Sequence, residues 1–375
     1  MVVMNAEGLR VAVIGCGYWG VKHVRVLSTA ESVAQVVAID ADTRRLEPVC
    51  RTVPGAVCFD NVTDALPHFD AAVIATPPLT HFPLAMQLIA AGKHVMVEKP
   101  LATSANHATT MIAAAERAGV VLMVGHTFEY HAAVWKLREM LARNELGDLY
   151  YIDTARLNLG LYQSDVNVID DLAPHDISII NYVLGAQPVA VQSWGARNAH
   201  RQMEDVAYIR LKYAEPDVVA NVHVSWLDPC KVRRVTVVGS RKMAVYNDLA
   251  SEERIRVYDK GVLSDASPAD DMTPPMSYRY GDVVSPFLAV EEPLAVEDKH
   301  FVDCVRDGTR PMTDGANGLA VVKTLECAQI SLREGRMVQL AELDEQPVAK
   351  LDRLPRTLDR LDVSRPLEAS VPLSR

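Results

Sequence analysis

VAVIGCGYWG, residues 11–20, decides the fold, because four apolar residues run directly into a glycine-rich turn. The first glycine permits a tight turn, the second lets the backbone approach a pyrophosphate, and the third lets the next helix pack close to the strand. Free N–H groups at that helix N-terminus favour a negatively charged ligand. The segment predicts a strand–turn–helix unit that binds a dinucleotide through Gly15, Gly17, Tyr18, Trp19 and Gly20.

An acidic residue stands where a dinucleotide-binding unit needs one. Asp40 ends the next apolar run and lies twenty residues after Gly20. A carboxylate there accepts hydrogen bonds from ribose hydroxyls and repels a 2′-phosphate, so the expected cofactor is NAD rather than NADP. Arg44 and Arg45 lie nearby and could soften that preference, although a solvated helix start is the more ordinary role for them.

The first third of the chain alternates strand-like and helix-like segments, which is typical of a doubly wound parallel sheet. Strand-like runs cover residues 10–14, 35–40, 71–75, 94–97 and 120–124, and helix-like runs cover 81–91 and an alanine-rich stretch that ends at Gly119. After Gly125 the pattern changes to strict alternation, as in 207–213 and 218–226, which indicates a sheet with one buried face. Helices are expected over 297–306 and 315–334.

The predicted organisation is an α/β Rossmann domain at 1–126, an α+β domain for substrate binding and oligomerisation at 127–345, and an extended tail at 346–375. A length of 375 residues fits two domains. A net charge of −10 without a basic run argues against nucleic-acid binding. Six cysteines without a CxxC pair predict no metal site, and as scattered single cysteines they fit a reducing cytoplasm. No signal peptide or membrane-length apolar run is apparent, so no membrane partner is expected.

Four further motifs follow the glycine loop in order: ATPPLTH at 75–81, VEKPLA at 97–102, GHTFEY at 125–130 and DLAPHDIS at 171–178. With them the chain resembles the Gfo/Idh/MocA oxidoreductases over roughly residues 9 to 340. The resemblance implies a Rossmann domain followed by a large open, mostly antiparallel sheet, through which homodimers or homotetramers form. The stretches 156–168 and 223–240 look most like members that oxidise or reduce C3 of nucleotide-linked or glycosidic sugars.

Hydride transfer from an alcohol carbon requires a group that takes the hydroxyl proton and a charge that stabilises the alkoxide. The resemblance gives these roles to His175 and Lys99. Asp171 lies four residues before His175, so the two share a face if a helix has begun by then. One departure is the Asp170-Asp171 pair, where the nearest subgroup often has tryptophan–asparagine, and this leaves the exact substrate open.

Other site residues are expected from the same motifs. Thr76, Pro77 and His81 should line the cofactor cleft, Glu98 should contact the nicotinamide side or position Lys99, and His126 should lie under the nicotinamide. Candidates for substrate hydroxyls or phosphates are Arg156, Asn158, Lys231 and Arg233, although cations on strands are often ordinary sheet-face residues. A lone lysine or histidine is usually structural, so the roles of Lys99 and His175 depend on the whole set of motifs.

Three functions remain open at this point. The first is an NAD-dependent dehydrogenase or ketoreductase for a nucleotide-linked or glycosidic sugar, and the second is a dehydrogenase for a free cyclitol or sugar such as inositol. The third is a non-catalytic NAD-sensing regulator, which would not need both Lys99 and His175.

Overall fold

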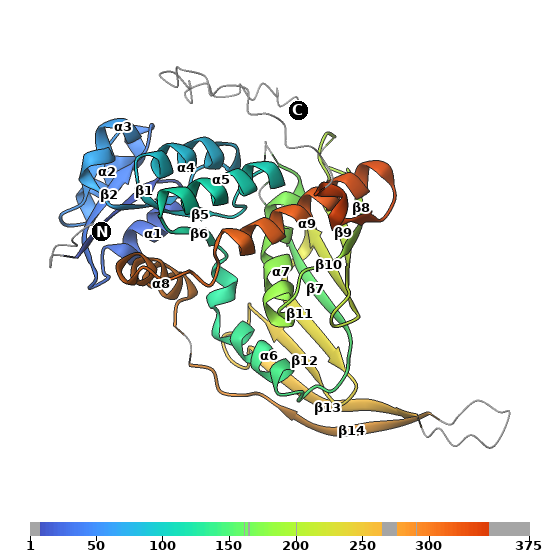
Figure 1. The fold of residues 1–375 in the computed structure, drawn as a ribbon. Coiled ribbons are helices and arrows are strands. Elements are labelled where there is room, and N and C mark those ends of the chain that lie inside the picture. The colour runs from blue at the N-terminus through green and yellow to red at the C-terminus, as the bar shows by residue number, and fades with distance from the viewer. Residues whose placement is uncertain are drawn as a thin grey trace, which may run out of the picture.

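The N-terminal part of the chain forms a six-stranded parallel sheet in the order β3-β2-β1-β4-β5-β6 (Figure 1). The computed structural model describes residues 8–160, 162–163, 166–199, 201–264, 276–289 and 291–344. The strands are β1 (Leu9–Ile14), β2 (Val33–Ile39), β3 (Val57–Phe59), β4 (Ala71–Ile74), β5 (His94–Glu98) and β6 (Leu122–Gly125). The helices between them are α1 (Gly20–Leu27), α2 (Thr43–Thr52), α3 (Val62–Ala65), η1 (Leu66–His68), η2 (Pro78–Thr80), α4 (His81–Ala90) and α5 (Ala105–Ala118).

Central strands of this sheet are buried on both faces, which explains why they appear in the sequence as continuous apolar runs. All four residues of β4 are buried, and Val11 to Ile14 of β1 are also buried. One face packs on α4 and α5, and the other packs on α1 and α2. The predicted Rossmann domain is confirmed. Strand β6 begins two residues later than expected because Gly119 caps α5 in the left-handed conformation, with φ +66°, and a short link follows.

The second sheet has nine strands in the order β14-β13-β12-β11-β7-β10-β9-β8-β15. Among the described residues, every strand pairing in it is antiparallel except that of β10 with β7, so the expected mostly antiparallel sheet is confirmed. Its strands are β7 (Leu149–Leu159), β8 (Ala190–Ala196), β9 (Val206–Tyr213), β10 (Val218–Ser225), β11 (Leu227–Gly239), β12 (Met243–Asn247), β13 (Ile255–Ser264), β14 (Met276–Val284) and β15 (Val338–Gln339).

Helices cover one face of the second sheet (Figure 1). They are η3 (Thr127–Tyr130), α6 (Ala132–Ala142), α7 (Val168–Leu184), α9 (Gly315–Glu334) and η4 (Leu340–Leu343). Helix α9 also reaches the first domain: Val321 and Leu325 belong to the core of the second sheet, whereas Val322 belongs to the Rossmann core. A Cβ at Gly318 would stand 2.8 Å from Leu101, so a glycine is needed where α9 crosses the first domain. The two sheets are therefore held by one shared helix.

Helix α8 (Pro293–Asp307) returns to the Rossmann domain although it follows the second sheet in the chain. Phe301, Val302 and Val305 join the core that contains β1 and α1, and Figure 1 shows α8 beside α1. The domain limits at 126 and 345 stay a prediction, and the tail 346–375 lies outside the described residues.

Two cysteines are paired, which corrects the expectation that all six are single. Cys50 at the end of α2 and Cys58 in β3 form a disulfide across eight residues. The short strand β3 places them side by side, and its three residues are too few to be predicted from the sequence. Cys16, Cys230, Cys304 and Cys327 are free.

A buried acid at the junction of the two domains gives a test of this packing. Glu129 of η3 is fully buried, and both of its carboxylate oxygens lie 3.1 Å from Nδ2 of Asn317 on α9. Burial raises the pKa of Glu129 from 4.5 to about 8. The folded protein therefore keeps this proton at neutral pH, whereas the unfolded chain loses it above pH 4.5.

We predict that Glu129→Gln stabilises the fold increasingly as the pH rises from 5 to 8. The free energy of unfolding of wild type falls by up to about 1.4 kcal/mol per pH unit in this window, because the folded state keeps the Glu129 proton that the unfolded chain loses. Glutamine does not titrate, so the variant lacks this loss. Thermal unfolding at both pH values measures the difference in melting temperature. A difference that does not change with pH would contradict the assignment of a protonated Glu129.

Candidate active site

The glycine-rich turn lies between β1 and α1, where the sequence predicts it. Gly15 has φ +92°, and a Cβ there would stand 2.8 Å from the carbonyl oxygen of Ala75. A Cβ on Gly20 would stand 1.8 Å from the carbonyl oxygen of Gly15, so both positions exclude side chains. A Cβ on Gly17 would meet only Nη1 of Arg45, at 3.8 Å. The open side of the loop at Gly17 therefore suits the close approach of a pyrophosphate to the backbone.

Asp40 is fixed beside this loop. Its Oδ2 accepts a hydrogen bond from the backbone N–H of Cys16 at 2.8 Å, and its Oδ1 accepts one from the N–H of Asp42 at 2.8 Å. Nη1 of Arg45 lies 3.7 Å from Oδ2 of Asp40, whereas Arg44 pairs with Asp42. The carboxylate thus stands at the end of β2 next to the phosphate-binding turn, as a ribose-binding acid requires.

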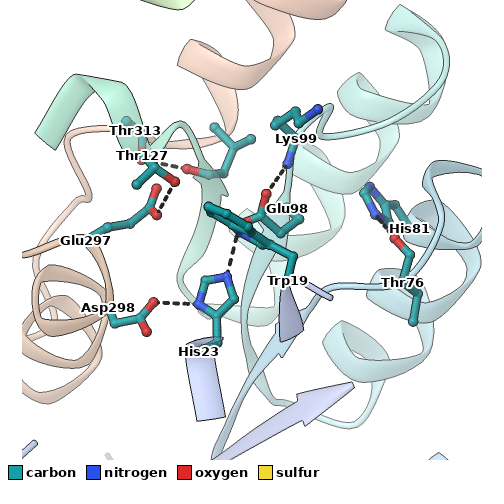
Figure 2. Close-up of polar contacts among 11 residues, drawn as sticks. Trp19, His23, Thr76, His81, Glu98, Lys99, Thr127, Glu297, Asp298 and Thr313 are labelled. Carbon is teal, nitrogen blue, oxygen red and sulfur yellow. Dashed lines mark hydrogen bonds and ion pairs between the residues drawn. The ribbon is translucent and has the colours of Figure 1, made fainter. Parts of the chain in front are cut away.

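His81 joins the loops that follow β4 and β5. Its Nε2 lies 2.8 Å from the carbonyl oxygen of Thr76 (Figure 2). Its Nδ1 lies 2.8 Å from the carbonyl oxygen of Pro100. The side chain has no exposed surface. His81 therefore holds the ATPP and EKP loops together, and direct contact of Thr76, Pro77 or His81 with a cofactor stays a prediction.

Trp19 and Glu98 connect the glycine loop to the EKP motif. The indole Nε1 of Trp19 donates to Oε1 of Glu98 at 2.7 Å (Figure 2). Glu98 ends β5 and is 8% exposed, and Lys99 follows it directly. Gly125 leaves the necessary room, because a Cβ there would lie 2.8 Å from Oε1 of Glu98. Two residues that are 79 apart in the sequence thus meet at the carboxyl ends of β1 and β5, the strands on either side of β4.

His126 carries two buried ring nitrogens that have no hydrogen-bond partner in the structure. It is 1% exposed, and burial lowers its pKa to about 4, so its imidazole is neutral. Buried polar atoms are normally satisfied, and unpaired ones call for an explanation. Together with the open side of Gly17, these atoms fit a site that receives a polar ligand such as a nicotinamide dinucleotide.

Lys99 reaches across to the second domain. Its ammonium Nζ donates to the backbone carbonyl of Asp171 at 2.8 Å and lies 3.7 Å from Oδ1 of the same residue. Asp171 is in the first turn of α7, which begins after the N-cap Asn167. The other carboxylate oxygen of Asp171 accepts a hydrogen bond from the indole of Trp226 at 3.0 Å. Lys99 and Asp171 therefore face one another across the two domains.

His175 lies one turn after Asp171 on α7, so the condition for their sharing a helix face is met. Its ring is partly buried against the edge of Phe128, with 5.1 Å between the ring centroids, and its Nδ1 has no partner. Burial, and then the positive charge of Lys99 and Arg156, lowers the pKa of His175 well below 6.5. A neutral imidazole next to an ammonium can accept a proton.

The predicted substrate-binding arginines are both paired with carboxylates. Nε of Arg156 donates to Oδ2 of Asp176 at 2.7 Å in a buried ion pair. Nη1 of Arg233 donates to Oδ2 of Asp248 at 3.1 Å. The register of β7 and β11 places the two arginines directly opposite one another. Asn158 lies two residues further along β7, and Lys231 is exposed near the start of β11. Contact of these residues with a substrate stays a prediction.

Several polar residues of this region were not found from the sequence. His23 of α1, Asp298 and Glu297 of α8, and Thr127 of η3 lie together behind Glu98 (Figure 2). A signal existed for the two acids: Glu297 and Asp298 fall on the apolar stripe formed by Leu294, Phe301 and Val305 at helical spacing. A carboxylate on such a stripe is buried and needs a partner.

Two kinds of feature are absent from the described residues: clusters of metal-binding side chains and helices able to span a membrane. Within the described residues, no group of three or more His, Cys, Asp or Glu side chains is arranged to hold a metal ion. In the same part of the chain, no helix combines the length and apolarity needed to cross a lipid bilayer.

Known proteins show similarity over both domains. Residues 9–126 match the oxidoreductase family with an NAD-binding Rossmann fold, and residues 134–245 match the Gfo/Idh/MocA C-terminal domain. UDP-N-acetylglucosamine 3-dehydrogenase of Acidithiobacillus ferrooxidans is 32% identical over 188 residues, which are 50% of this chain and 58% of the relative. Inositol 2-dehydrogenase 2 of Saccharopolyspora erythraea is 30% identical over 227 residues, 58% of this chain and 66% of the relative.

A solved structure extends the similarity to nearly the whole chain. GenD2 from gentamicin A biosynthesis, in complex with NAD, superimposes with a TM-score of 0.74 at 27% identity, over 90% of this chain and 97% of GenD2. The two family models together span more than half of the sequence, and they match the two sheets described above. The chain therefore belongs to the Gfo/Idh/MocA family and is an oxidoreductase with an NAD-binding Rossmann domain.

Proposed function

We propose that the protein transfers hydride between NAD and a secondary alcohol or ketone carbon, at C3, of a nucleotide-linked or glycosidic sugar. The observation that carries the proposal is the contact of Lys99 Nζ with Asp171, 2.8 Å from its backbone carbonyl oxygen and 3.7 Å from its carboxylate, one helical turn before the neutral His175. This contact joins an ammonium, a carboxylate and a proton acceptor at the carboxyl end of β5. The UDP-N-acetylglucosamine 3-dehydrogenase relative supports C3 of a nucleotide-linked sugar, and the complex of GenD2 with NAD supports the cofactor.

The chain's own residues supply the proton and charge chemistry. In the oxidation direction, His175 takes the proton of the reacting hydroxyl, and the ammonium of Lys99 stabilises the oxyanion. Asp171 binds Lys99 and, by our proposal, a neighbouring substrate hydroxyl. A bound NAD would supply the hydride acceptor for this oxidation of the alcohol to a ketone. Gly15, Gly17, Gly20, Tyr18, Trp19 and Asp40 would hold the dinucleotide, with Thr76, Pro77, His81, Glu98 and His126 around the nicotinamide end.

A free cyclitol or sugar is the second candidate substrate. Arg156 and Arg233 are each paired with an aspartate, which reduces the positive charge available to a substrate diphosphate. The similarity to an inositol 2-dehydrogenase points the same way. A substrate panel that includes both classes separates them.

We also propose a homo-oligomer that forms through the uncovered face of the second sheet. Trp194, Tyr208 and His223 lie in register across β8, β9 and β10, and Tyr208 stacks on His223 with 4.0 Å between the ring centroids. Trp194 is 58% exposed and Tyr208 is 49% exposed. Aromatic side chains gathered on one surface are typical of protein interfaces.

The first prediction concerns turnover. We expect a change in reduced-nicotinamide absorbance with NAD and one sugar from a panel of UDP-, GDP- and dTDP-sugars, free hexoses, aminoglycosides and inositols. Lys99→Ala and His175→Ala should each lower kcat about a hundredfold or more, because each removes a group that acts on the reacting oxygen. Lys93→Ala, in which the lost amine contacts the carbonyl and the ring of Phe69, is the control. NAD binding without turnover across a broad panel would favour the sensor function instead.

The second prediction concerns pH. Because the pKa of His175 lies below its ordinary value of 6.5, the base stays unprotonated to lower pH. The kcat/KM for alcohol oxidation should therefore remain level down to pH 6.5 and fall only below it. His175→Gln should lack this acidic limb. A limb centred above pH 6.5 that disappears in His175→Gln would contradict a base with a lowered pKa.

The third prediction concerns assembly. Light scattering after gel filtration should give a molar mass that is a multiple of the 41.2 kDa chain mass. The double variant Trp194→Asp, Tyr208→Asp should have a molar mass closer to that of one chain, because carboxylates buried in an interface oppose association. Leu249→Asp, at an exposed turn outside this aromatic row, is the control. A wild-type protein with the mass of one chain would contradict the proposed oligomer.

A further inference from the structure

Four ionisable side chains are buried together behind the proposed cofactor site (Figure 2). His23 and Glu297 have no exposed surface, Asp298 is 1% exposed and Glu98 is 8% exposed. They come from α1, β5 and α8, so the cluster depends on the return of α8 to the Rossmann domain. Burying such a cluster is costly unless its charges are paired, and this cluster lies outside the proposed proton-transfer group.

His23 joins two of the acids. Its Nε2 lies 3.0 Å from Oε1 of Glu98, and its Nδ1 lies 2.8 Å from Oδ1 of Asp298. Both ring nitrogens can donate to carboxylates at the same time only in the imidazolium form. Although burial alone would lower it, the two carboxylates raise the pKa of His23 well above its ordinary value. The geometry and the charge balance therefore agree on a cationic His23 between two anions.

Glu98 is the member of the cluster that is nearest to the reacting end. Its Oε1 also accepts the hydrogen bond of Trp19 at 2.7 Å, and the backbone N–H of Lys99 lies 3.2 Å from its Oε2. With Gly125 packed against it, the carboxylate has little freedom to turn. His126 is close enough for its pKa to be influenced by Glu98 and by Lys99. The fixed anion thus faces the region that we assign to the nicotinamide.

Glu297 completes the cluster as a neutral acid. Its Oε2 accepts a hydrogen bond from the hydroxyl of Thr127 at 2.7 Å, and its Oε1 is buried without a partner. Burial, and then the nearby Glu98 and Asp298, raises the pKa of Glu297 well above 4.5. With Glu297 protonated, the charged contacts of the cluster are those of His23 with Glu98 and Asp298.

We propose that His23 is a positioning residue that holds Glu98 as a fixed anion beside the nicotinamide, and that this anion favours the oxidised, positively charged cofactor over the reduced one. The inference rests on the proposed NAD-dependent function. The nicotinamide ring is a cation in NAD⁺ and neutral in NADH, so a nearby buried carboxylate interacts differently with the two forms. Tighter relative binding of NAD⁺ makes hydride uptake by the bound cofactor less favourable, so Glu98 would shift the internal equilibrium towards the alcohol.

The ratio of two dissociation constants tests this proposal without any turnover. NADH binding is measured by its fluorescence, and NAD⁺ binding by calorimetry, for wild type, Glu98→Gln and Glu297→Gln. Glu98→Gln removes the anion but can still accept from Trp19, so Kd for NAD⁺ should rise roughly tenfold relative to Kd for NADH. Glu297→Gln is the matched control: it is the same substitution in the same cluster but replaces a neutral acid, so the ratio should not change.

His23→Gln tests the positioning role separately. Without the imidazolium, the buried Glu98 carboxylate loses its cation and should take up a proton more readily. NAD⁺ affinity should then weaken relative to NADH between pH 8 and pH 6, whereas the wild-type ratio should stay level over this range. This variant also serves if Glu98→Gln does not fold, as judged by circular dichroism.

Several results would overturn the proposal. If Glu98→Gln weakens the binding of NAD⁺ and NADH equally, or leaves the ratio of their dissociation constants unchanged, the role of Glu98 is purely structural. If the ratio of the NAD⁺ and NADH dissociation constants shifts as much in Glu297→Gln as in Glu98→Gln, Glu98 is not the residue that sets the preference. If this ratio does not change with pH in His23→Gln, His23 does not hold Glu98 as an anion. Failure of the wild-type protein to bind either NAD⁺ or NADH would contradict the proposed function itself, which separates the two claims.

Discussion

A single ammonium group between two domains is the interaction on which the site depends. Lys99 is the central residue of the EKP motif that follows β5, and its Nζ lies 2.8 Å from the carbonyl oxygen of Asp171 at the start of α7. That contact brings the edge of a parallel sheet, where open α/β folds bind ligands, against the helix that carries His175. Helix α9 holds this arrangement because its residues belong to both cores.

Charge around this contact is arranged in pairs. Arg156 with Asp176, Arg233 with Asp248 and His23 with Glu98 and Asp298 each join a cation to carboxylates in buried or half-buried surroundings. Buried ion pairs add little net stability, but the loss of one partner is costly, so they fix orientation. Burial, and then the nearby cations Lys99 and Arg156, lower the pKa of His175, which favours its neutral form. The side chains that form structural ion pairs are thus different from His175, the side chain to which we assign proton transfer.

The glycine loop, Asp40, the parallel sheet and the alternating second sheet could be predicted, because each has a local pattern of residues. Lys99, Asp171 and His175 were found by resemblance to a family, and the structure adds their mutual placement. The pairing of His23 with Asp298 could not be predicted, since it joins residues 275 apart through the return of α8. The carboxylate partners of Arg156 and Arg233 lie on other parts of the chain, so the alternating pattern of a strand does not reveal these ion pairs.

A crystal structure of the protein with NADH and the unreacted sugar alcohol would test the central claim most directly. The account predicts that one hydroxyl oxygen lies within hydrogen-bond distance of both Lys99 Nζ and His175 Nε2, with its carbon facing C4 of the nicotinamide. The nicotinamide should lie on the side of Glu98 and His126. A sugar bound away from Lys99 and His175, or a nicotinamide outside the region of Glu98, would contradict the proposed site.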